Sequence, residues 1–135
     1  RSLEAENIAQ IVADEIHGFD NERYFLMAYC IMPNHVHLLI QALLMEHLHH
    51  KGKTAKYPVA DSMRFIKGRS ARFCNLELHR EGSFWHHESY DHYARDEAEA
   101  TRIILYIINN PVKAGLAKHW KDWKFTYVSP ELGEW

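Results

Sequence analysis

Two apolar segments joined by a turn most constrain what this chain can fold into. Residues 24–32 (YFLMAYCIM) are aromatic and aliphatic, as is typical of a β-strand, and residues 35–41 (HVHLLIQ) resume the strand pattern. Pro33 and Asn34 stand between them, and both residue types favour turns. The pattern predicts a β-hairpin, so an antiparallel sheet is the expected centre of the fold.

Three segments have helical spacing. Aliphatic residues recur along residues 3–17, and Gly18 supplies a stop signal. A second helix is expected after residue 58, with an apolar side and a basic remainder. The third has the strongest signal, because Asp96 and Glu99 form a capping box ahead of an apolar stripe. The stripe consists of Ala100, Ile103, Ile104, Ile107 and Ile108. Pro111 and Gly115 are expected to end this helix.

The remaining segments are less regular. Residues 41–58 are polar and rich in His, Lys and Gly, which favours a mobile surface connection. Residues 83–93 are dense in aromatic side chains and are expected to be extended. The tail has enough aromatic area to pack back on the domain through Trp120, Trp123, Phe125 and Tyr127.

In chain order these elements read helix, strand, strand, helix, strand, helix. The 135 residues, 47% of them apolar, suit one domain over residues 1–135. The order predicts an α+β fold with a ferredoxin-like antiparallel sheet and helices packed on one face. A leading strand would complete the βαββαβ pattern, and we expect this first strand to be missing from the chain.

Composition bears on the cellular compartment. No apolar run approaches the roughly 18 residues that a membrane helix needs. The amino end lacks the pattern of a secretory signal, so a cytoplasmic location without membrane contact is expected. Cys30 and Cys74 have no metal-clip spacing, and both are interpreted as reduced packing residues.

Charge is unevenly distributed along the chain. The formal net charge of −2 by itself argues weakly against a nucleic-acid partner. Residues 51–80, however, hold eight basic and two acidic residues, so this segment has a local excess of six positive charges. Charge alone leaves two interpretations open, a solvated helix face and a phosphate-binding patch.

The first candidate site is His35-Val36-His37 in the second strand. Side chains at positions i and i+2 of a strand share a face, which places two imidazoles side by side as ligands for one divalent cation. Val36, Leu38 and Ile40 then face the core on the other side. Two half-buried histidines without a metal would show the same pattern, and for this motif alone that interpretation is favoured.

The second candidate site lies on the third helix, where Tyr106 and Asn110 are four residues apart and share a face. Taken alone, an edge-of-core tyrosine and a helix-ending asparagine are the favoured interpretation. Together with the histidines, however, these residues supply two imidazoles, an amide oxygen and a phenol. These are the groups required for metal-assisted attack by tyrosine on a phosphodiester.

Three ordered motifs resemble those of a known family. The matching segments are MPNHVHLLI at residues 32–40, residues 84–96 from Phe84-Trp85 to Arg95-Asp96, and YIINNPVKAGL at residues 106–116. In this order they are similar to the single-tyrosine HUH transposases of the IS200-like group, and within these to the REP-associated tyrosine transposases.

The resemblance implies a metal-dependent endonuclease and strand transferase that acts on single-stranded DNA, usually near a hairpin. Such an enzyme forms a covalent 5′-phosphotyrosine and leaves a 3′-hydroxyl. The resemblance implies His35, His37 and Asn110 as metal ligands and Tyr106 as the nucleophile, with Mg²⁺ or Mn²⁺ as the ion in use. Family members include both monomers and homodimers.

Single-stranded or hairpin DNA is therefore the expected partner. Under this hypothesis the DNA backbone is contacted by Arg64, Lys67, Arg69, Arg72, Lys51, Lys53 and Lys56. Trp85 and Tyr90 could stack on unpaired bases, although core packing is the favoured interpretation for either one. His92 and Arg95 match a family segment, for which we expect structural support or a phosphate contact.

Three other functions remain open at this level. A domesticated DNA-hairpin-binding protein would keep the site without transposing, and its DNA binding would survive Tyr106→Phe. A small metallohydrolase would use His35 and His37 to activate water, without a covalent protein intermediate. A purely structural ferredoxin-like domain is last, because it leaves the joint presence of three motifs unexplained.

Overall fold

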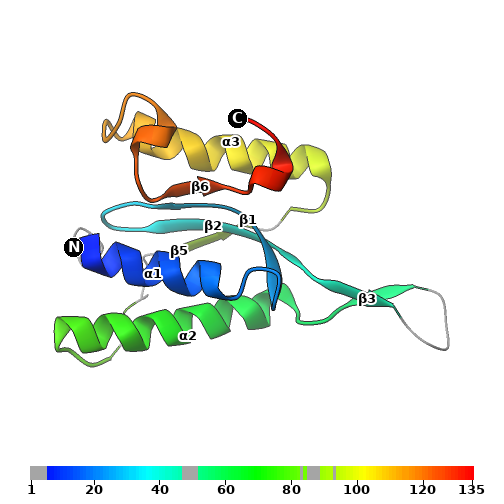
Figure 1. Ribbon diagram of the computed structural model, residues 1–135, viewed down its shortest axis with the longest axis horizontal. Coiled ribbons are helices and arrows are strands. Elements are labelled where there is room, and N and C mark those ends of the chain that lie inside the picture. Colours follow the sequence, from blue (N-terminus) through cyan, green and yellow to red (C-terminus); the bar gives the residue numbers. More distant parts are fainter. Residues whose placement is uncertain (1–5, 47–51, 83, 85–88, 93) are drawn as a thin grey trace.

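The computed structural model describes residues 6–46, 52–82, 84 and 94–135, and the backbone alone of residues 89–92. A four-stranded sheet with strand order β5-β2-β1-β6 forms its centre (Figure 1). β1 (Tyr24–Ile31) and β2 (Val36–Ala42) are the two arms of the predicted hairpin, which is confirmed. β6 (Thr126–Val128) pairs antiparallel with β1, whereas β5 (Ser89–His92) runs parallel to β2.

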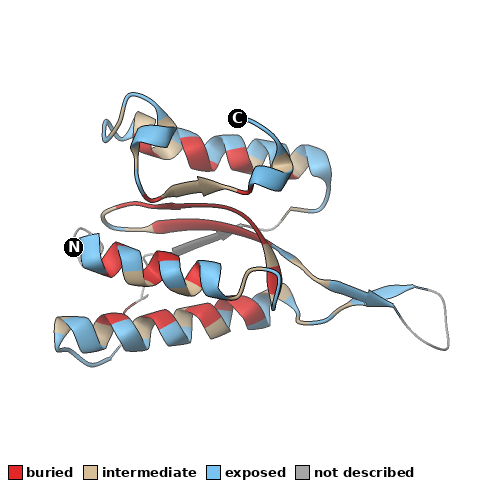
Figure 2. Ribbon diagram, in the orientation of Figure 1, coloured by how far each residue is buried: buried red, intermediate tan, exposed pale blue. Residues whose placement is uncertain are grey.

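Helices cover both faces of this sheet (Figure 1). α1 (Glu6–Gly18) and α2 (Val59–Leu78) pack on one face, and α3 (Glu97–Lys113) packs on the other. The expected α+β class is confirmed, with two details that differ from expectation: the parallel β2–β5 pair and the cover on both faces. Figure 2 shows the cause, because β1 and β2 are buried along most of their length. Strands with apolar residues on both faces need cover on both sides.

A shift of register in β1 sets which of its residues face α3. The pairing with β2 slips between Leu26 and Ala28, where one strand has an extra residue. Leu26 therefore faces the α1–α2 side, whereas Met27 and Ala28 both face α3. Beyond the shift, Cys30 faces α3 and pairs in register with His37 of β2.

The segment expected to be an irregular connection contains a second, two-stranded sheet. β3 (Leu44–Glu46) pairs antiparallel with β4 (Lys53–Ala55), and the pair projects from the body as an arm (Figure 1). Its side chains are largely exposed, including Leu44 at 63% and Met45 at 50%. The expectation of irregular structure was wrong for these residues, because backbone pairing between neighbouring segments does not require a buried face.

α3 continues past the proline that was expected to end it. Pro111 lies inside the helix and is buried, and the helix reaches Lys113 before Ala114 caps it. The missing N–H of Pro111 removes one donor. The helical pattern resumes beyond it, because the carbonyl of Asn110 accepts from the backbone N–H of Ala114 at 2.9 Å. Gly115, with a φ of 75°, then provides the left-handed turn that stops the helix.

The aromatic tail packs back on the sheet, as expected. The Trp123 indole N–H donates to the Ile31 carbonyl at 2.9 Å, and Phe125 is buried. The tail also contains two short 3₁₀ helices, η2 (Trp120–Asp122) and η3 (Pro130–Leu132), on either side of β6. Strand β6 was not predicted, because its three residues carry too short a pattern.

Two further expectations concern the whole chain. Cys30 and Cys74 are both buried and free, as expected for packing residues. Among the described residues, no helix is long and apolar enough to cross a membrane.

Candidate active site

The histidine pair lies on the side of the sheet that α3 covers. Val36, Leu38 and Ile40 belong to the core on the opposite face, so the predicted alternation along β2 is confirmed. His35 immediately precedes β2, and His37 is the second residue of the strand and only 3% exposed. Their ring centroids are 5.0 Å apart, with the ring planes at 85°.

Asn34 orients the first imidazole. The Nδ1 atom of His35 lies 2.6 Å from the Oδ1 atom of Asn34, so this nitrogen carries the proton and donates. Nε2 of His35 is then the nitrogen suited to binding an ion, as in many metal sites where a second residue fixes the tautomer. Burial lowers the pKa of His35, which favours the neutral form that binds metals. Sequence reasoning treated Asn34 only as a turn residue.

Tyr106 meets the histidine pair from α3. Its ring centroid is 5.3 Å from that of His37, with the ring planes at 83°. The buried residues Ile104, Ile107 and Ile108 seat α3 on the sheet, and Tyr106 lies at the edge of this stripe. The Tyr106 side chain is 53% exposed, so the phenol is held against His37 and remains accessible from solvent.

Asn110 follows one helical turn after Tyr106 and is half-buried. Its Nδ2 atom donates to the backbone carbonyl of Tyr106 at 2.7 Å. This bond restrains the amide and leaves Oδ1 as the atom that could bind a cation. The sequence-based expectation that both residues share a face is confirmed, while a ligand role for Asn110 stays a prediction.

The donor set is compatible with a divalent cation. Imidazole nitrogens bind transition metals at about 2.1 Å, so the two rings that share an ion must lie close together. The rings of His35 and His37 are close enough for this. An amide oxygen adds a hard ligand suited to Mg²⁺ or Mn²⁺. No cluster of three or more His, Cys, Asp or Glu that could hold a metal occurs within the described part of the chain. A cation at this position would therefore depend on the amide of Asn110 and on substrate oxygens.

The structure does not place the described members of the predicted DNA-binding set next to Tyr106. Arg64, Lys67, Arg69 and Arg72 belong to α2, which covers the face of the sheet opposite to α3. Lys53 lies on the projecting arm, 3.9 Å from Glu46, and Lys56 follows the arm. Lys51 lies outside the described residues, as does Trp85, and the Tyr90 side chain is likewise not described.

Arg69 has a structural role in the interface between α1 and α2. Its Nε atom lies 2.8 Å from Oε2 of Glu15. Its guanidinium also lies 5.0 Å from the ring centroid of Phe19 and 5.5 Å from that of Phe73. Arg72, in contrast, is exposed on the same helix, and Arg64 pairs with Asp61 one turn before it.

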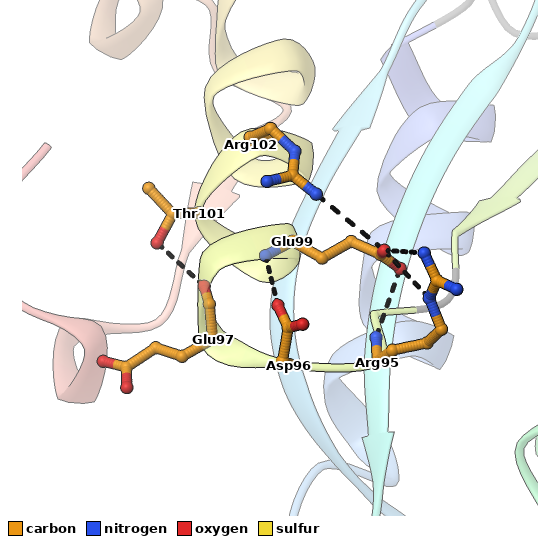
Figure 3. A network of polar contacts seen from close by, with 6 residues as sticks. All are labelled: Arg95, Asp96, Glu97, Glu99, Thr101 and Arg102. Atoms are coloured by element: carbon orange, nitrogen blue, oxygen red, sulfur yellow. Dashed lines mark hydrogen bonds and ion pairs between the residues drawn. The ribbon is translucent and has the colours of Figure 1, made fainter.

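The last two candidates, Arg95 and His92, lie near the start of α3. Figure 3 shows Arg95 in contact with Glu99, with Nη2 of Arg95 3.0 Å from Oε2 of Glu99. The Asp96 carboxylate accepts from the Glu99 N–H at 2.8 Å, so the predicted N-cap is confirmed. Arg95 thus stabilises the helix start, and Tyr106 lies ten residues beyond Asp96, a rise of about 15 Å. The side chain of His92 is outside the described set.

The chain is similar to proteins of a known family. Residues 4–110 match the family model described as "Transposase IS200 like". Over 101 residues the chain is 31% identical to a Haemophilus influenzae protein that carries the provisional name REP-associated tyrosine transposase. The match covers 74% of this chain and 56% of the relative, so the chain spans just over half the length of that protein. No solved structure gives a significant match.

The family model covers most of the chain, including both histidines, Tyr106 and Asn110. The chain therefore belongs to the IS200-like transposase family, and the resemblance seen in its motifs is confirmed.

Proposed function

We propose that this chain carries the nuclease site of a metal-dependent transposase, which cleaves and rejoins single-stranded DNA at hairpin-associated positions. One observation carries the proposal: the accessible phenol of Tyr106 packs against His37, which lies beside His35. A nucleophile that packs against one of two neighbouring imidazoles is suited to attack on a phosphate held by a cation.

In the proposed reaction, Oη of Tyr106 attacks the scissile phosphorus of the DNA. The new Oη–P bond forms as the P–O3′ bond breaks, and the phosphate stays on the 5′ oxygen of the downstream strand. The phenol loses its proton and the departing 3′ oxygen gains one, so the reaction consumes no net proton. One ester replaces another, which lets a free 3′-hydroxyl reverse the step without a nucleotide cofactor.

His35, His37 and Asn110 would hold the divalent cation, Mg²⁺ or Mn²⁺. When bound, the cation neutralises charge on the scissile phosphate and thereby stabilises the transition state. His37 also supports the ring of Tyr106, and Asn110 restrains the backbone of the same turn through its bond to the Tyr106 carbonyl. These contacts hold Tyr106 beside residues that would bind the ion.

Single-stranded or hairpin DNA is the proposed substrate. A hairpin stem would reach beyond the nuclease site, and the exposed cations of α2 and of the arm are available for its backbone. Lys53, Arg64 and Arg72 are the exposed candidates, and Lys67 is a half-buried candidate on the same helix. Arg69 contributes less, because Glu15 already pairs with its guanidinium.

The test is the formation of a covalent protein–DNA adduct. The chain is incubated with a pool of single-stranded DNA hairpins in Mn²⁺, and adducts that resist denaturation are scored. We expect an adduct that is lost in Tyr106→Phe and in the presence of a chelator. Tyr106→Phe is a matched control because it removes only the hydroxyl and keeps the ring that contacts His37.

Each other outcome contradicts the proposal in a distinct way. Hairpin binding that Tyr106→Phe leaves unchanged, without cleavage by the unaltered chain, would identify a binding protein. Cleavage that proceeds without a covalent protein intermediate would identify a metallohydrolase in which the cation activates water.

A further inference from the structure

A shallow groove lies beside Tyr106, between α3 and the segment that leads into η2. Its volume is about 490 Å³, which is within the range of pockets that hold small organic ligands. One wall is α3, with Leu105, Tyr106 and Asn109. The other wall is the segment that leads into η2, with Lys118, His119 and Trp120. The groove is therefore continuous with the candidate nucleophile.

The second wall combines positive charge with hydrogen-bond donors. Lys118 and His119 are exposed, and none of the described residues that line the groove is a carboxylate. Nδ1 of His119 accepts from the backbone N–H of Lys121 at 3.2 Å. The ring proton of the neutral imidazole therefore resides on Nε2, so His119 can donate a hydrogen bond outward without being charged. A groove of this kind fits an anion such as a phosphodiester.

The same wall presents an aromatic surface with a fixed orientation. The Trp120 indole N–H points to the Trp135 carbonyl at 3.4 Å, and the ring lies 26° from the plane of His119, with centroids 6.0 Å apart. Nζ of Lys121 lies 5.5 Å from the Trp120 ring centroid. Aromatic rings held beside cations are the common platform for unpaired bases.

We propose that this groove binds a nucleotide of single-stranded DNA next to the scissile phosphate. Lys118 and His119 contact the adjoining phosphate, and the base lies against Trp120 and the side of α3. The inference rests on the proposed function, because Tyr106 is what links the groove to the reacting phosphate. It assigns a DNA contact to a part of the chain in which the sequence motifs indicated none.

The groove is tested by DNA binding in the absence of metal. A fluorescein-labelled pool of 20-nucleotide single-stranded DNA with randomised sequence is titrated with the full chain in EDTA, and the Kd is read from anisotropy. Lys118→Ala and His119→Asn are the variants, and Asn is chosen because its side-chain oxygen can still accept from the Lys121 N–H. Lys124→Ala is the matched control, since Lys124 is an exposed cation that pairs with Glu6 away from the groove.

We expect the Lys118→Ala/His119→Asn double variant to raise the Kd about tenfold, and Lys118→Ala alone to lower the salt slope of binding by about one. Lys124→Ala should leave the Kd within about twofold. In a parallel measurement, ultraviolet cross-linking of a 5-iodouracil-substituted version of the pool should attach DNA to the peptide that contains Trp120. The proposed role of the groove would be contradicted by equal Kd values for the groove variants and the control. It would also be contradicted if the unaltered chain did not bind the DNA.

The covalent adduct assay separates this inference from the proposed function. If the unaltered chain forms no adduct but the groove variants weaken binding, the groove stands and the nuclease proposal fails. If every protein forms the Tyr106 adduct with the same dependence on DNA concentration, the nuclease proposal stands and the groove is overturned. A shift of that dependence to higher DNA concentration, at an unchanged maximal rate, supports both.

Discussion

The ring of Tyr106 meets that of His37 edge to face, with 5.3 Å between the centroids, and this contact joins α3 to β2. The two residues contribute differently to the fold, because His37 is 3% exposed and Tyr106 is 53% exposed. His35, at the outer end of the pair, is half-buried. Chemistry and stability are therefore separable by substitution in this site.

The first prediction compares the two histidines. His35→Ala and His37→Ala should each abolish adduct formation, because each removes one of the two imidazoles proposed as metal ligands. His37→Ala should also lower the free energy of unfolding by about 1–3 kcal/mol, since it leaves a space between β2 and α3. His35→Ala should cost less than about 1 kcal/mol. Urea unfolding and the adduct assay check the pair.

The control for this comparison is DNA binding without metal. Both variants should keep most of their affinity for hairpins, because the cation serves the chemical step. A loss of affinity as large as the loss of cleavage, in a variant that is still folded, would contradict a role confined to chemistry.

The second prediction separates two arginines of α2. Arg69 is paired with Glu15 and lies over the rings of Phe19 and Phe73, so Arg69→Ala should lower the free energy of unfolding by about 1 kcal/mol. Arg72 is exposed, and Arg72→Ala should change stability by less than about 0.5 kcal/mol. Chemical denaturation of the two variants is the measurement.

DNA binding should show the reverse order. Arg72→Ala should reduce the salt slope of hairpin binding by about one, because a guanidinium at a phosphate releases one counterion. Arg69→Ala should leave the slope unchanged, since Glu15 already neutralises its charge. If neither variant alters the slope, α2 does not face the DNA.

The elements that the sequence predicted are those whose own periodicity decides their structure. The hairpin of β1 and β2 follows from two apolar runs around Pro33-Asn34, and the stripe of α3 from its spacing. The same periodicities place His35 and His37 on one face and Tyr106 at the edge of the helix stripe. A period of two in the strand and of 3.6 in the helix thus predicted most of the site.

The features that the sequence did not predict depend on contacts between distant segments. To predict that helices cover both faces of the sheet, one must know that α3 packs against β1. The unbroken apolar run of β1 was the one signal in the sequence that both faces are buried. The bond from Asn34 to His35 depends on turn geometry. The groove beside Tyr106 forms only because the chain after α3 folds back against this helix. No local sequence pattern therefore marks Lys118 and His119 as groove residues.

The third prediction concerns the start of α3. Asp96 accepts from the Glu99 N–H, so Asp96→Ala should lower the free energy of unfolding by about 1 kcal/mol. That loss corresponds to roughly 4 °C in Tm for a domain of this size. Asp96→Asn should retain most of the stability, because its side-chain oxygen still caps the helix. Glu97→Ala, at an exposed neighbour, is the control for lost charge. Equal losses in Asp96→Ala and Asp96→Asn would mean that charge matters here more than the cap.

The last prediction is a pH dependence of stability centred on His17. This residue lies in the last turn of α1, and its Nε2 atom is 2.9 Å from the Tyr29 hydroxyl. Its ring is edge-on to that of Tyr127, with 4.6 Å between the centroids. Burial lowers the pKa of His17, and the nearby carboxylates of Asp20 and Asp14 only partly oppose it. The unfolded chain therefore takes up a proton more readily than the folded one. Stability is complete above the ordinary histidine pKa of about 6.5 and falls as the pH drops below it.

Urea unfolding from pH 7.5 to pH 5 should show this fall, and His17→Gln should reduce its slope because glutamine does not titrate. Part of the slope should remain, since burial lowers the pKa of His35 as well, and His17→Gln/His35→Ala should flatten it further. Glu6 and Glu99 act at lower pH, because Lys124 and Arg95 hold the pKa of each carboxyl below its usual value. A slope between pH 7.5 and pH 5 that is the same in the double variant and in the unaltered chain would show that neither histidine is responsible.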